Sequence, residues 1–358
     1  MILVISPEPW DGHFVSKHHY AIELAKRGHD VIFHGPPQAG PFRFEKVVQS
    51  DAQITVLHAP QVMPGLRFVP ASVRRALEAH WLRRLELLSK KPVELVWLFE
   101  NSRFFDMSFA GDRLKIYHQV DLNQNFHVEA AATTANHVFC TSKRIWERLR
   151  EVRADAKIIH HGVRLDPFDP KTEASLFPDG RINCAYVGNL SMSYLDRDLL
   201  IRSIRALPHV LFHFFGGFRE NDPFEGALGV HDNVRLHGKV VSSRVLPILA
   251  NADVLLVAYQ KAHFEDQSNP HKMMEYMMSG KVTVATYTSE YEQVSELLAM
   301  CPPDGDYTEL LSQVIRDIDA WNAPDQMRRR QAFAADNTYP RQLERIAKAL
   351  GPKGYLIA

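Results

Sequence analysis

Short apolar runs alternate with helical patterns along the sequence, and this alternation constrains the possible fold more than any other feature. In the first half, the predicted strands cover residues 1–6, 30–35, 54–59, 94–99, 115–120, 137–142 and 157–162. Helical patterns lie between several of them, such as the one that ends at Gly28. Strands that are apolar at consecutive positions are typical of parallel sheets, which are buried on both faces. The alternation therefore predicts βαβ units and an α/β fold.

The alternation breaks once, at residues 164–180, where three prolines, mixed charges and a terminal Asp-Gly are typical of a linker. After the break, the predicted strands cover residues 182–188, 210–216, 233–238, 253–259 and 281–286. A chain of 358 residues is long enough for two domains of about 150–200 residues each. We therefore predict two Rossmann-like, doubly wound domains that face a cleft, and ligands in such folds bind beyond the carboxyl ends of the strands. The predicted divisions are residues 1–163, the linker 164–180, residues 181–335, and a C-terminal helix at 336–358 that returns to the first domain.

Composition excludes several classes of protein. Apolar residues make up 46% and charged residues 23%, which is typical of a globular chain and not of a disordered one. Because 42 basic residues balance 42 acidic ones, we expect no nucleic-acid partner. Cys140, Cys184 and Cys301 lie far apart, which excludes a cysteine-based zinc site and indicates a reduced, cytoplasmic protein. Neither a signal peptide nor an apolar run of about 20 residues is expected.

The stretch SNPHKMMEYMMSGKVTVAT contains the sharpest indication of a ligand. Asn269 suits a helix N-cap and Gly280 suits the position where that helix ends, so a helix of about ten residues is predicted. Lys272 then lies in the first turn, where the helix dipole disfavours a cation unless an anion is bound. Glu275 follows three residues later on the same face. The alternative, on spacing alone, is an exposed Lys–Glu pair of little energetic consequence.

Two glycine-containing turns in the same half add to this indication. Gly188 and Asn189 follow the strand predicted at 182–188, whereas Gly238 and Lys239 end a second predicted strand. A glycine lets the backbone approach a pyrophosphate closely, although an ordinary βα turn is the alternative for each glycine taken singly. Because the carboxyl ends of parallel strands meet at one edge of a sheet, we expect these turns to share that edge with Lys272.

The ordered combination of segments resembles the GT-B-fold glycosyltransferases, nucleotide-sugar-dependent enzymes of the kind that build bacterial polysaccharides and other glycans. The donor-binding half of that family resembles YVGNLS, NVRLHGKVVSSRVLPILANADVLLVAY and SNPHKMMEYMMSGKVTVAT. Its acceptor-binding half resembles PEPWDGHFVSKHHYAIELAKRGHDVIFHGPP and, at its end, IYHQVDL, HVFCTSKRIWERL and IIHHGVRLDPF. The resemblance implies an acceptor-binding first domain and a second domain that binds the nucleotide sugar.

The resemblance also implies roles for individual residues. Glu275 is expected to bind the ribose hydroxyls, and Lys272 with the start of its helix is expected to hold the phosphates. Gln267 stands where many relatives have the first glutamate of a Glu-x7-Glu pair, which contacts the sugar, so a neutral hydrogen bond is expected there instead. The implied donor-binding residues are Gly12, Gly188, Asn189, His237, Gly238, Lys239, Gln267, Ser268, Asn269, Lys272 and Glu275.

Two residues of the first half are candidates for catalysis. Transfer with inversion requires a base on the acceptor hydroxyl, and Asp121 directly follows the strand predicted at 115–120. A turn cap is the alternative role for Asp121. His13 lies in the loop after the first predicted strand, where it is expected to act as a base or to contact phosphate or sugar, unless it is a structural loop histidine. Many retaining relatives have His-Asp at the position of Asp121, but here Val120 precedes it.

No metal site is predicted. No cofactor is predicted either, because the nucleotide sugar is a substrate, and a UDP-sugar is the favoured donor. Three Asp-x-Asp pairs are candidate metal ligands, since another glycosyltransferase fold uses that motif to hold a metal ion. Asp196–Asp198 and Asp304–Asp306 precede helical patterns and are expected to stabilise helix starts, whereas Asp317–Asp319 is expected inside a helix.

Residues 73–91 form an amphipathic helical pattern with Leu77, Trp81, Leu85 and Leu88 as its apolar stripe. The segment contains six lysines and arginines but only two glutamates. A domain helix with a solvated face is one interpretation. The other is peripheral contact with an anionic membrane, which would place the protein at the inner face of that membrane.

The sequence therefore predicts a metal-independent glycosyltransferase that transfers a sugar, of the hexosyl type, to a glycan, polysaccharide or lipid-linked acceptor. Two alternatives stay open. One is a nucleotide-sugar epimerase or hydrolase on the same fold, and the other is a GT-B scaffold without catalytic activity, which the glutamine at position 267 suggests.

Overall fold

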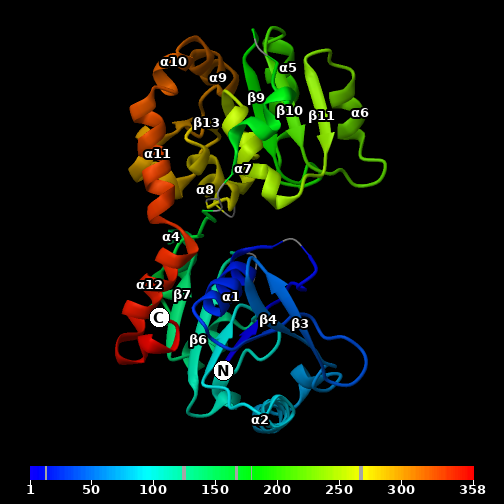
Figure 1. Cartoon of the computed structure of the whole chain (residues 1–358), viewed down its shortest axis with the longest axis vertical. Helices are drawn as coiled ribbons and strands as arrows, with labels where there is room; N and C mark the ends of the chain where they lie inside the picture. The colour runs from blue at the N-terminus through cyan, green and yellow to red at the C-terminus, as the bar shows by residue number, and fades with distance from the viewer. Residues whose placement is uncertain (13, 123–125, 166–167, 179, 266–268) are drawn as a thin grey trace. The chain divides into compact units, whose positions relative to one another are not determined.

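The computed structural model describes residues 1–358 except 13, 123–125, 166–167, 179 and 266–268. The chain forms two compact units, coloured along the chain in Figure 1. The first unit contains Met1–Gly162 together with Tyr339–Ala358, and the second contains Val163–Thr338. Each unit is built on one mixed or parallel sheet flanked by helices, which confirms the predicted α/β class with two Rossmann-like sheets.

The first unit has an eight-stranded sheet in the order β3-β4-β2-β1-β5-β6-β7-β8. Its strands are β1 (Ile2–Ile5), β2 (Val31–His34), β3 (Arg43–Gln49), β4 (Ala52–His58), β5 (Leu95–Leu98), β6 (Leu114–Gln119), β7 (His137–Cys140) and β8 (Lys157–Ile158). All neighbours pair in parallel except β3 and β4, which form a hairpin whose turn residues Ser50 and Asp51 have positive φ.

Helices cover both faces of this sheet. They are α1 (Ser16–Lys26), α2 (Ala71–Ser89), α3 (Val128–Thr134), α4 (Lys143–Leu149), α12 (Tyr339–Leu350) and the 3-10 helices η1 (Leu66–Phe68), η2 (Met107–Ala110) and η6 (Gly351–Leu356). Alternate residues of β1 point to opposite sides: Ile2 and Val4 pack with α1 and α12, whereas Leu3 and Ile5 pack with α2, α3 and α4. This two-sided burial is why the strands are apolar at every position.

The C-terminal residues of the chain belong to the first unit. α12 packs against α1 (Figure 1). Arg27, the residue directly after α1, donates hydrogen bonds to the carbonyl oxygens of Pro340 and Ile357, each at 3.0 Å. Leu343 and Ile346 lie in the same buried cluster as β1. The first unit therefore consists of two segments that are far apart in sequence.

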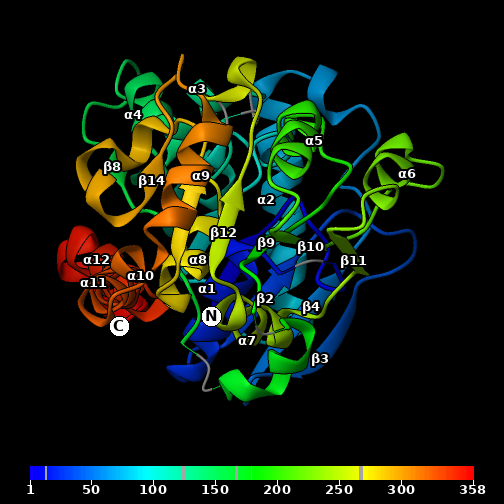
Figure 2. The ribbon, with the colours of Figure 1, turned by 90° about the horizontal axis from the view of Figure 1, so that it is seen from above.

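The second unit has a six-stranded sheet in the order β11-β10-β9-β12-β13-β14, with every pair parallel. Its strands are β9 (Asn183–Val187), β10 (Leu211–Phe215), β11 (Val234–Gly238), β12 (Val254–Val257), β13 (Val282–Ala285) and β14 (Ala299–Met300). Its helices are α5 (Arg197–Ala206), α6 (Pro223–Gly229), α7 (Ser242–Asn251), α8 (Lys272–Ser279), α9 (Tyr307–Arg316), α10 (Ile318–Trp321), α11 (Pro324–Asp336), η3 (Pro170–Leu176), η4 (Lys261–His263) and η5 (Ser289–Leu297). One apolar cluster includes α5, α6 and α9, and another includes α7, α8 and α11. In both views α6 lies beside β11 at the edge of the sheet (Figures 1 and 2).

The segment predicted as a linker, residues 164–180, lies within the second unit. Its helix η3 is joined to α7 by the buried carboxylate of Glu173, which accepts hydrogen bonds from the Arg244 guanidinium at 2.6 and 2.7 Å. This bidentate pair fixes the segment to the body of the unit.

Every strand predicted from the sequence overlaps an observed strand, but two observed strands were missed. β3 carries charged residues and is half exposed, as edge strands commonly are, so it lacks the apolar run that marks the central strands. β14 has only two residues and gives no pattern.

α2 corresponds to the predicted amphipathic helix at 73–91. Trp81 and Leu85 are buried as predicted, and Leu77 is half-buried. Leu88 is 49% exposed, so its assignment to the buried stripe was wrong; the helix ends one residue later and this turn extends past the core. No helix within the described part of the chain has the length and apolar character needed to cross a membrane.

Candidate functional site

The helix that carries Lys272 is α8, and it begins later than the sequence predicts. α8 starts at Lys272 with His271 as its N-cap, so the predicted N-cap Asn269 was wrong. The side-chain oxygen of Asn269 instead accepts a hydrogen bond from the Tyr291 hydroxyl at 3.0 Å. Gly280 ends the helix with φ of 82°, as predicted.

Tyr276 anchors α8 to the end of β9. Its hydroxyl accepts a hydrogen bond from the Val187 N–H at 2.9 Å and donates to the Val187 carbonyl at 3.4 Å. The Tyr276 side chain is fully buried. Because Lys272 and Glu275 lie on the same short helix, this anchor sets their position against the turn at Gly188. No local sequence pattern marks Tyr276 as part of the site.

The Lys272 ammonium lies against aromatic and glycine surface. Its Nζ is 3.9 Å from the centroid of the Tyr186 ring and 5.8 Å from that of Tyr259. A Cβ atom on Gly188 would lie 2.7 Å from Nζ, so the lysine occupies space that only glycine leaves open. Among the described residues, Lys272 forms no ion pair with a carboxylate. A half-buried cation in such surroundings is suited to binding an anion.

Burial moves the pKa values of Lys272 and Glu275 toward each other. It lowers the pKa of Lys272 to about 7, and the negative charge of Glu275 opposes this shift. Burial also raises the pKa of Glu275 to about 7, against the charges of Lys272 and Arg164. The two groups therefore change protonation near neutral pH. Such perturbed pairs are common at functional sites.

Glycines lie side by side where three strands of this sheet end: Gly188 and Gly216 directly follow β9 and β10, and Gly238 is the last residue of β11. The Gly188 N–H bonds the carbonyl that ends β10, at Phe215, and the Gly216 N–H bonds the carbonyl of Gly238. A Cβ on Gly216 would overlap the Gly188 carbonyl, so no side chain fits between the strands. The edge formed by β9, β10 and β11 is therefore bare backbone, which allows a phosphate to come close. Gly216 was not predicted, although it carries the same signal as Gly188, namely a glycine at the end of a predicted strand.

His237 and Lys239 lie at the outer part of this edge. The His237 ring stacks on the Phe215 ring with centroids 4.1 Å apart. Lys239 is exposed, and a Cβ on Gly217 would lie 2.4 Å from its Cε, so its stem covers that glycine. The predicted border for a nucleotide base thus consists of an imidazole face, a lysine stem and the backbone of Gly238.

The remaining residues that were predicted for the donor site lie in different parts of the structure. Asn189 is exposed, and its side-chain oxygen accepts a hydrogen bond from the Ser191 N–H at 2.9 Å, which shapes the turn after β9. Gly12 lies in the exposed loop after β1, in the first unit. His13, Gln267 and Ser268 lie outside the residues that the structure describes.

Asp121 follows β6 at the carboxyl edge of the first sheet, as predicted. Its backbone carbonyl accepts a hydrogen bond from the Gln119 side chain at 3.1 Å. The surrounding protein raises the pKa of Asp121 by desolvation, with Glu8 adding to the shift and Lys17 opposing it. A carboxylate whose pKa is raised is a better proton acceptor than an ordinary aspartate.

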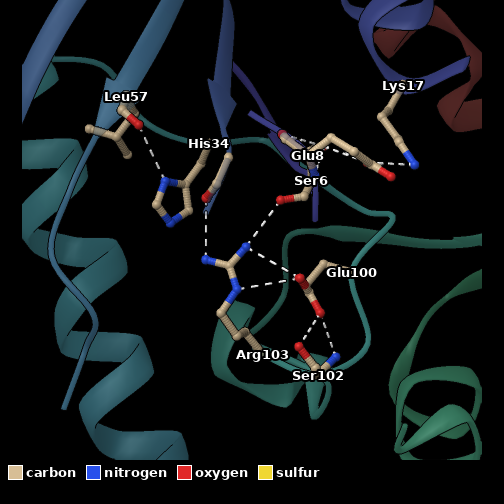
Figure 3. A network of polar contacts seen from close by, with 9 residues as sticks. Ser6, Glu8, Lys17, His34, Leu57, Glu100, Ser102 and Arg103 are labelled. Atoms are coloured by element: carbon tan, nitrogen blue, oxygen red, sulfur yellow. Dashed lines mark hydrogen bonds and ion pairs between the residues drawn. The ribbon is translucent and has the colours of Figure 1, made fainter. Parts of the chain in front are cut away.

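An ionic network at the carboxyl edge of the same sheet was not predicted from the sequence (Figure 3). Lys17 has a side chain only 2% exposed and pairs with Glu8 at 2.6 Å. Glu100, two residues after β5, accepts hydrogen bonds from the backbone and hydroxyl of Ser102 and pairs with Arg103. The signal for Glu100 was present, since it follows a predicted strand as directly as Asp121 does. No local sequence signal marks Lys17. Its position on α1 is buried only because the loop that carries Glu8 packs against it.

The Asp-x-Asp pairs act mainly as helix caps. The Asp196 side chain accepts from the Leu199 N–H at the start of α5, and that of Asp306 accepts from two N–H groups at the start of α9. Asp319 lies inside α10, as predicted, whereas Asp317 lies at the junction of α9 and α10 and not inside a helix. Within the described residues, no group of three or more His, Cys, Asp or Glu side chains is placed to hold a metal ion.

Residues 181–318 match the family model described as Glycosyl transferases group 1. The matched stretch covers most of the second unit, including the glycine edge and α8. No curated protein sequence matches the chain.

Solved structures share the fold over almost the entire chain. The sucrose-phosphate synthase of Thermosynechococcus elongatus superposes with a TM-score of 0.71 at 14% identity, covering 98% of both chains. WaaG, a glycosyltransferase involved in lipopolysaccharide biosynthesis, gives 0.64 at 14% identity, covering 98% of this chain and 100% of its own. Anabaena HepE, solved in complex with UDP and glucose, gives 0.68 at 14% identity, covering 98% and 99%. The fold is that of the GT-B glycosyltransferases, and the family match supports a transferase enzyme.

Proposed function

We propose that this chain, a glycosyltransferase of the GT-B fold, transfers a sugar from a nucleotide-sugar donor to a glycan, polysaccharide or lipid-linked acceptor. The observation that carries the proposal is the position of Lys272, whose ammonium lies against the Gly188 turn on a helix that Tyr276 anchors to β9. Complexes of two structural neighbours contain UDP or a UDP-sugar, which makes a UDP-sugar the first donor to test.

The second unit binds the donor in this proposal. The bare edge at Gly188, Gly216 and Gly238 admits the diphosphate, and the Lys272 ammonium neutralises the charge that grows on the leaving phosphate. Glu275, one turn further along α8, accepts hydrogen bonds from the ribose hydroxyls. The base packs beside His237. Because the lysine supplies the positive charge, no metal ion is required, and activity should persist in excess EDTA.

The chemistry breaks the bond between the anomeric carbon and the leaving phosphate oxygen and forms a bond from that carbon to an acceptor oxygen. In a direct displacement, Asp121 takes the proton of the attacking hydroxyl, and the leaving nucleotide departs as a diphosphate anion held by Lys272. The acceptor binds to the first unit, which carries Asp121.

A titration of the full chain with UDP, GDP, ADP and TDP tests the donor site. At least one nucleotide should raise the melting temperature, and Lys272→Met should abolish that rise. Lys239→Met serves as a control for a lysine at the outer part of the same edge, where a smaller loss is expected. If none of the four nucleotides changes the melting temperature, the donor-site proposal is wrong.

Product analysis separates transfer from the other activities that the fold permits. With donor and acceptor, a transferase forms a glycoside; a hydrolase releases free sugar without an acceptor, and an epimerase changes the donor sugar. A chain that binds nucleotide but gives none of these products is a scaffold without catalytic activity.

We further propose that α2 contacts an anionic membrane surface where the acceptor is lipid-linked. Its solvent-facing side presents Arg83 and Arg84 next to Leu87 and Leu88, which are 79% and 49% exposed. Both glutamates of the helix point elsewhere: Glu78 is buried, and Glu86 pairs with Arg113 at 2.8 Å. Cations beside exposed leucines suit a bilayer with negatively charged lipids.

Sedimentation with vesicles of phosphatidylcholine, with and without phosphatidylglycerol, tests this contact. Binding should require the anionic lipid and should be lost in the double variant Arg83→Glu/Arg84→Glu. Equal binding of that variant, or no binding of the unmodified chain, contradicts the proposal.

A further inference from the structure

The first unit contains a cavity of about 330 Å³ that none of the predicted site residues lines. It lies where β2, β4 and β5 end, between the loop at residues 60–68 and the helix α2. Cavities of roughly 300 Å³ and more are the usual size of small-molecule sites. The space is therefore sufficient for a ligand of monosaccharide size.

The wall of the cavity combines aromatic rings with guanidinium groups. Phe104 and Phe105 are buried, whereas Phe68, on η1, is 78% exposed. Arg74 stacks on the Phe105 ring, with its guanidinium carbon 4.3 Å from the centroid, and Arg67 stacks on Phe68 at 4.7 Å. Flat aromatic faces suit the apolar face of a sugar ring, and guanidinium groups suit phosphate or carboxylate.

A buried acid at the wall has an unused hydrogen-bonding atom. Glu78 is only 1% exposed and lines the cavity. One of its oxygens interacts with the backbone N–H of Phe104, and the other, Oε2, has no hydrogen-bond partner among the described residues. Burial raises the pKa of Glu78 to about 8, although the charge of Arg74 opposes the shift. A buried polar atom without a partner is costly unless a ligand satisfies it.

The charges around the cavity do not balance. Arg103 is neutralised by Glu100 and held in place by the carbonyl oxygens of Ser6 and Gly35 (Figure 3). Arg74 shares one carboxylate, Asp106, with a neighbouring arginine, at N–O distances of 3.6 and 3.3 Å.

The remaining arginine of the wall, Arg67, is exposed and forms no ion pair with a described carboxylate. Since Arg67 has no described carboxylate partner and two arginines share Asp106, the cavity has excess positive charge at its mouth. An anionic ligand is favoured there.

We propose that this cavity binds an anionic sugar as the acceptor, with its ring against the phenylalanines, a hydroxyl at Glu78, and its phosphate or carboxylate at Arg67 and Arg74. The inference rests on the proposed function, because it assigns the cavity to the acceptor of the transfer. It also narrows that function, since a neutral glycan leaves the excess charge unpaired.

Calorimetric titration of the full chain tests the inference. The probes are hexose 6-phosphates and hexuronates of gluco, galacto and manno configuration, the matching neutral hexoses, and inorganic phosphate. At least one anionic sugar should bind about tenfold or more tightly than both its neutral counterpart and inorganic phosphate. The phosphate and uronate arms identify which anion the site prefers.

Arg67→Ala should remove this preference, and Glu78→Gln should weaken binding of the anionic sugar while the protein remains folded. Arg150→Ala is the matched control, because Arg150 is also exposed and stacks on an aromatic ring, that of Trp146, at 4.9 Å. It should leave the affinity unchanged.

UDP binding, measured in parallel, distinguishes the two proposals. If UDP or another nucleotide binds but no anionic sugar binds more tightly than its neutral counterpart, the cavity assignment is overturned and the donor site stands. Inorganic phosphate binding as tightly as the sugar phosphates, or unchanged affinity in Arg67→Ala, also overturns it. If no nucleotide binds, the proposed function itself fails.

Discussion

The ammonium of Lys272 lies 3.9 Å from the centroid of the Tyr186 ring, on the edge of the second sheet where Gly188 follows β9. The ring packs under the lysine and limits its contact with water, while the glycine leaves the other side open. This arrangement provides a cation with little competing partner charge.

Gly188→Ala should lower nucleotide affinity by roughly tenfold or more, a loss of about 1.4 kcal/mol or more. The new Cβ would lie 2.7 Å from Lys272 Nζ, and φ at this position is 150°, which side chains rarely adopt. Gly226→Ala is the control, because this glycine has open space around it and lies in α6. Isothermal titration with the best nucleotide compares the two variants; equal affinities would contradict a close approach of the ligand to this turn.

Nucleotide diphosphate affinity should fall as the pH rises from 7 to 9. The pKa of Lys272 is lowered to about 7, so the ammonium loses its proton in this window, whereas the phosphates are already ionised above a pH of about 7. The dissociation constant should increase by at least about tenfold across the window. In Lys272→Met it should be weak and nearly independent of pH. A flat profile for the unmodified protein would show that Lys272 does not bind the phosphates.

Asp121→Asn should lower kcat by about 100-fold or more if Asp121 is the base that accepts the acceptor proton. The amide keeps the shape of the side chain but cannot take up a proton. The nucleotide-induced rise in melting temperature should be unchanged, because the donor-binding residues lie in the other unit. Full turnover of the variant would exclude Asp121 as the base.

Glu8→Gln should destabilise the first unit more than Lys17→Met does, by about 2 kcal/mol. The glutamine leaves an ammonium buried without its anion, since the Lys17 side chain is only 2% exposed. The methionine removes the buried charge and leaves a carboxylate that is 38% exposed and can be solvated. Differential scanning calorimetry of both variants checks the order, and the reverse order would show that Lys17 is compensated by another group.

Arg330→Met should destabilise the second unit by about 2–4 kcal/mol. This arginine is 1% exposed and donates hydrogen bonds to the carbonyl oxygens of Leu297, Gly280 and Trp321 at 2.8–2.9 Å. Arg329→Met is the matched control, because Arg329 is exposed on the same helix and should change stability by less than about 0.5 kcal/mol. Denaturant unfolding of the two variants gives the comparison; equal stabilities would mean that water replaces the lost hydrogen bonds.

Local sequence patterns were sufficient for most of the sheet framework. The residues of β1 and β9 are all buried, and this requirement leaves an apolar run in the sequence that can be recognised without a structure. The same patterns failed for β3, whose exposed charges match a loop as well as an edge strand. They also misplaced the start of α8, because the Asn269 side chain bonds to Tyr291, which lies 22 residues away.

The candidate site was only partly predictable for the same reason. Lys272, Glu275 and Gly188 carry local signals, namely a cation in the first turn of a helix and a glycine after a strand. Tyr276 carries none, although its hydroxyl fixes the helix to a strand 89 residues earlier.

Sequence alone determined the α/β class, the two sheets and the residue types available at the strand ends, because periodicity and burial are properties of neighbouring residues. Tertiary structure alone decided that Lys272 lies over Tyr186, that Glu78 is buried without a partner for one oxygen, and that Arg67 meets no carboxylate in the described residues. These features depend on contacts between segments far apart in the chain. Burial and charge compensation arise from such contacts, and they set the pKa values and the ligand preference of each site.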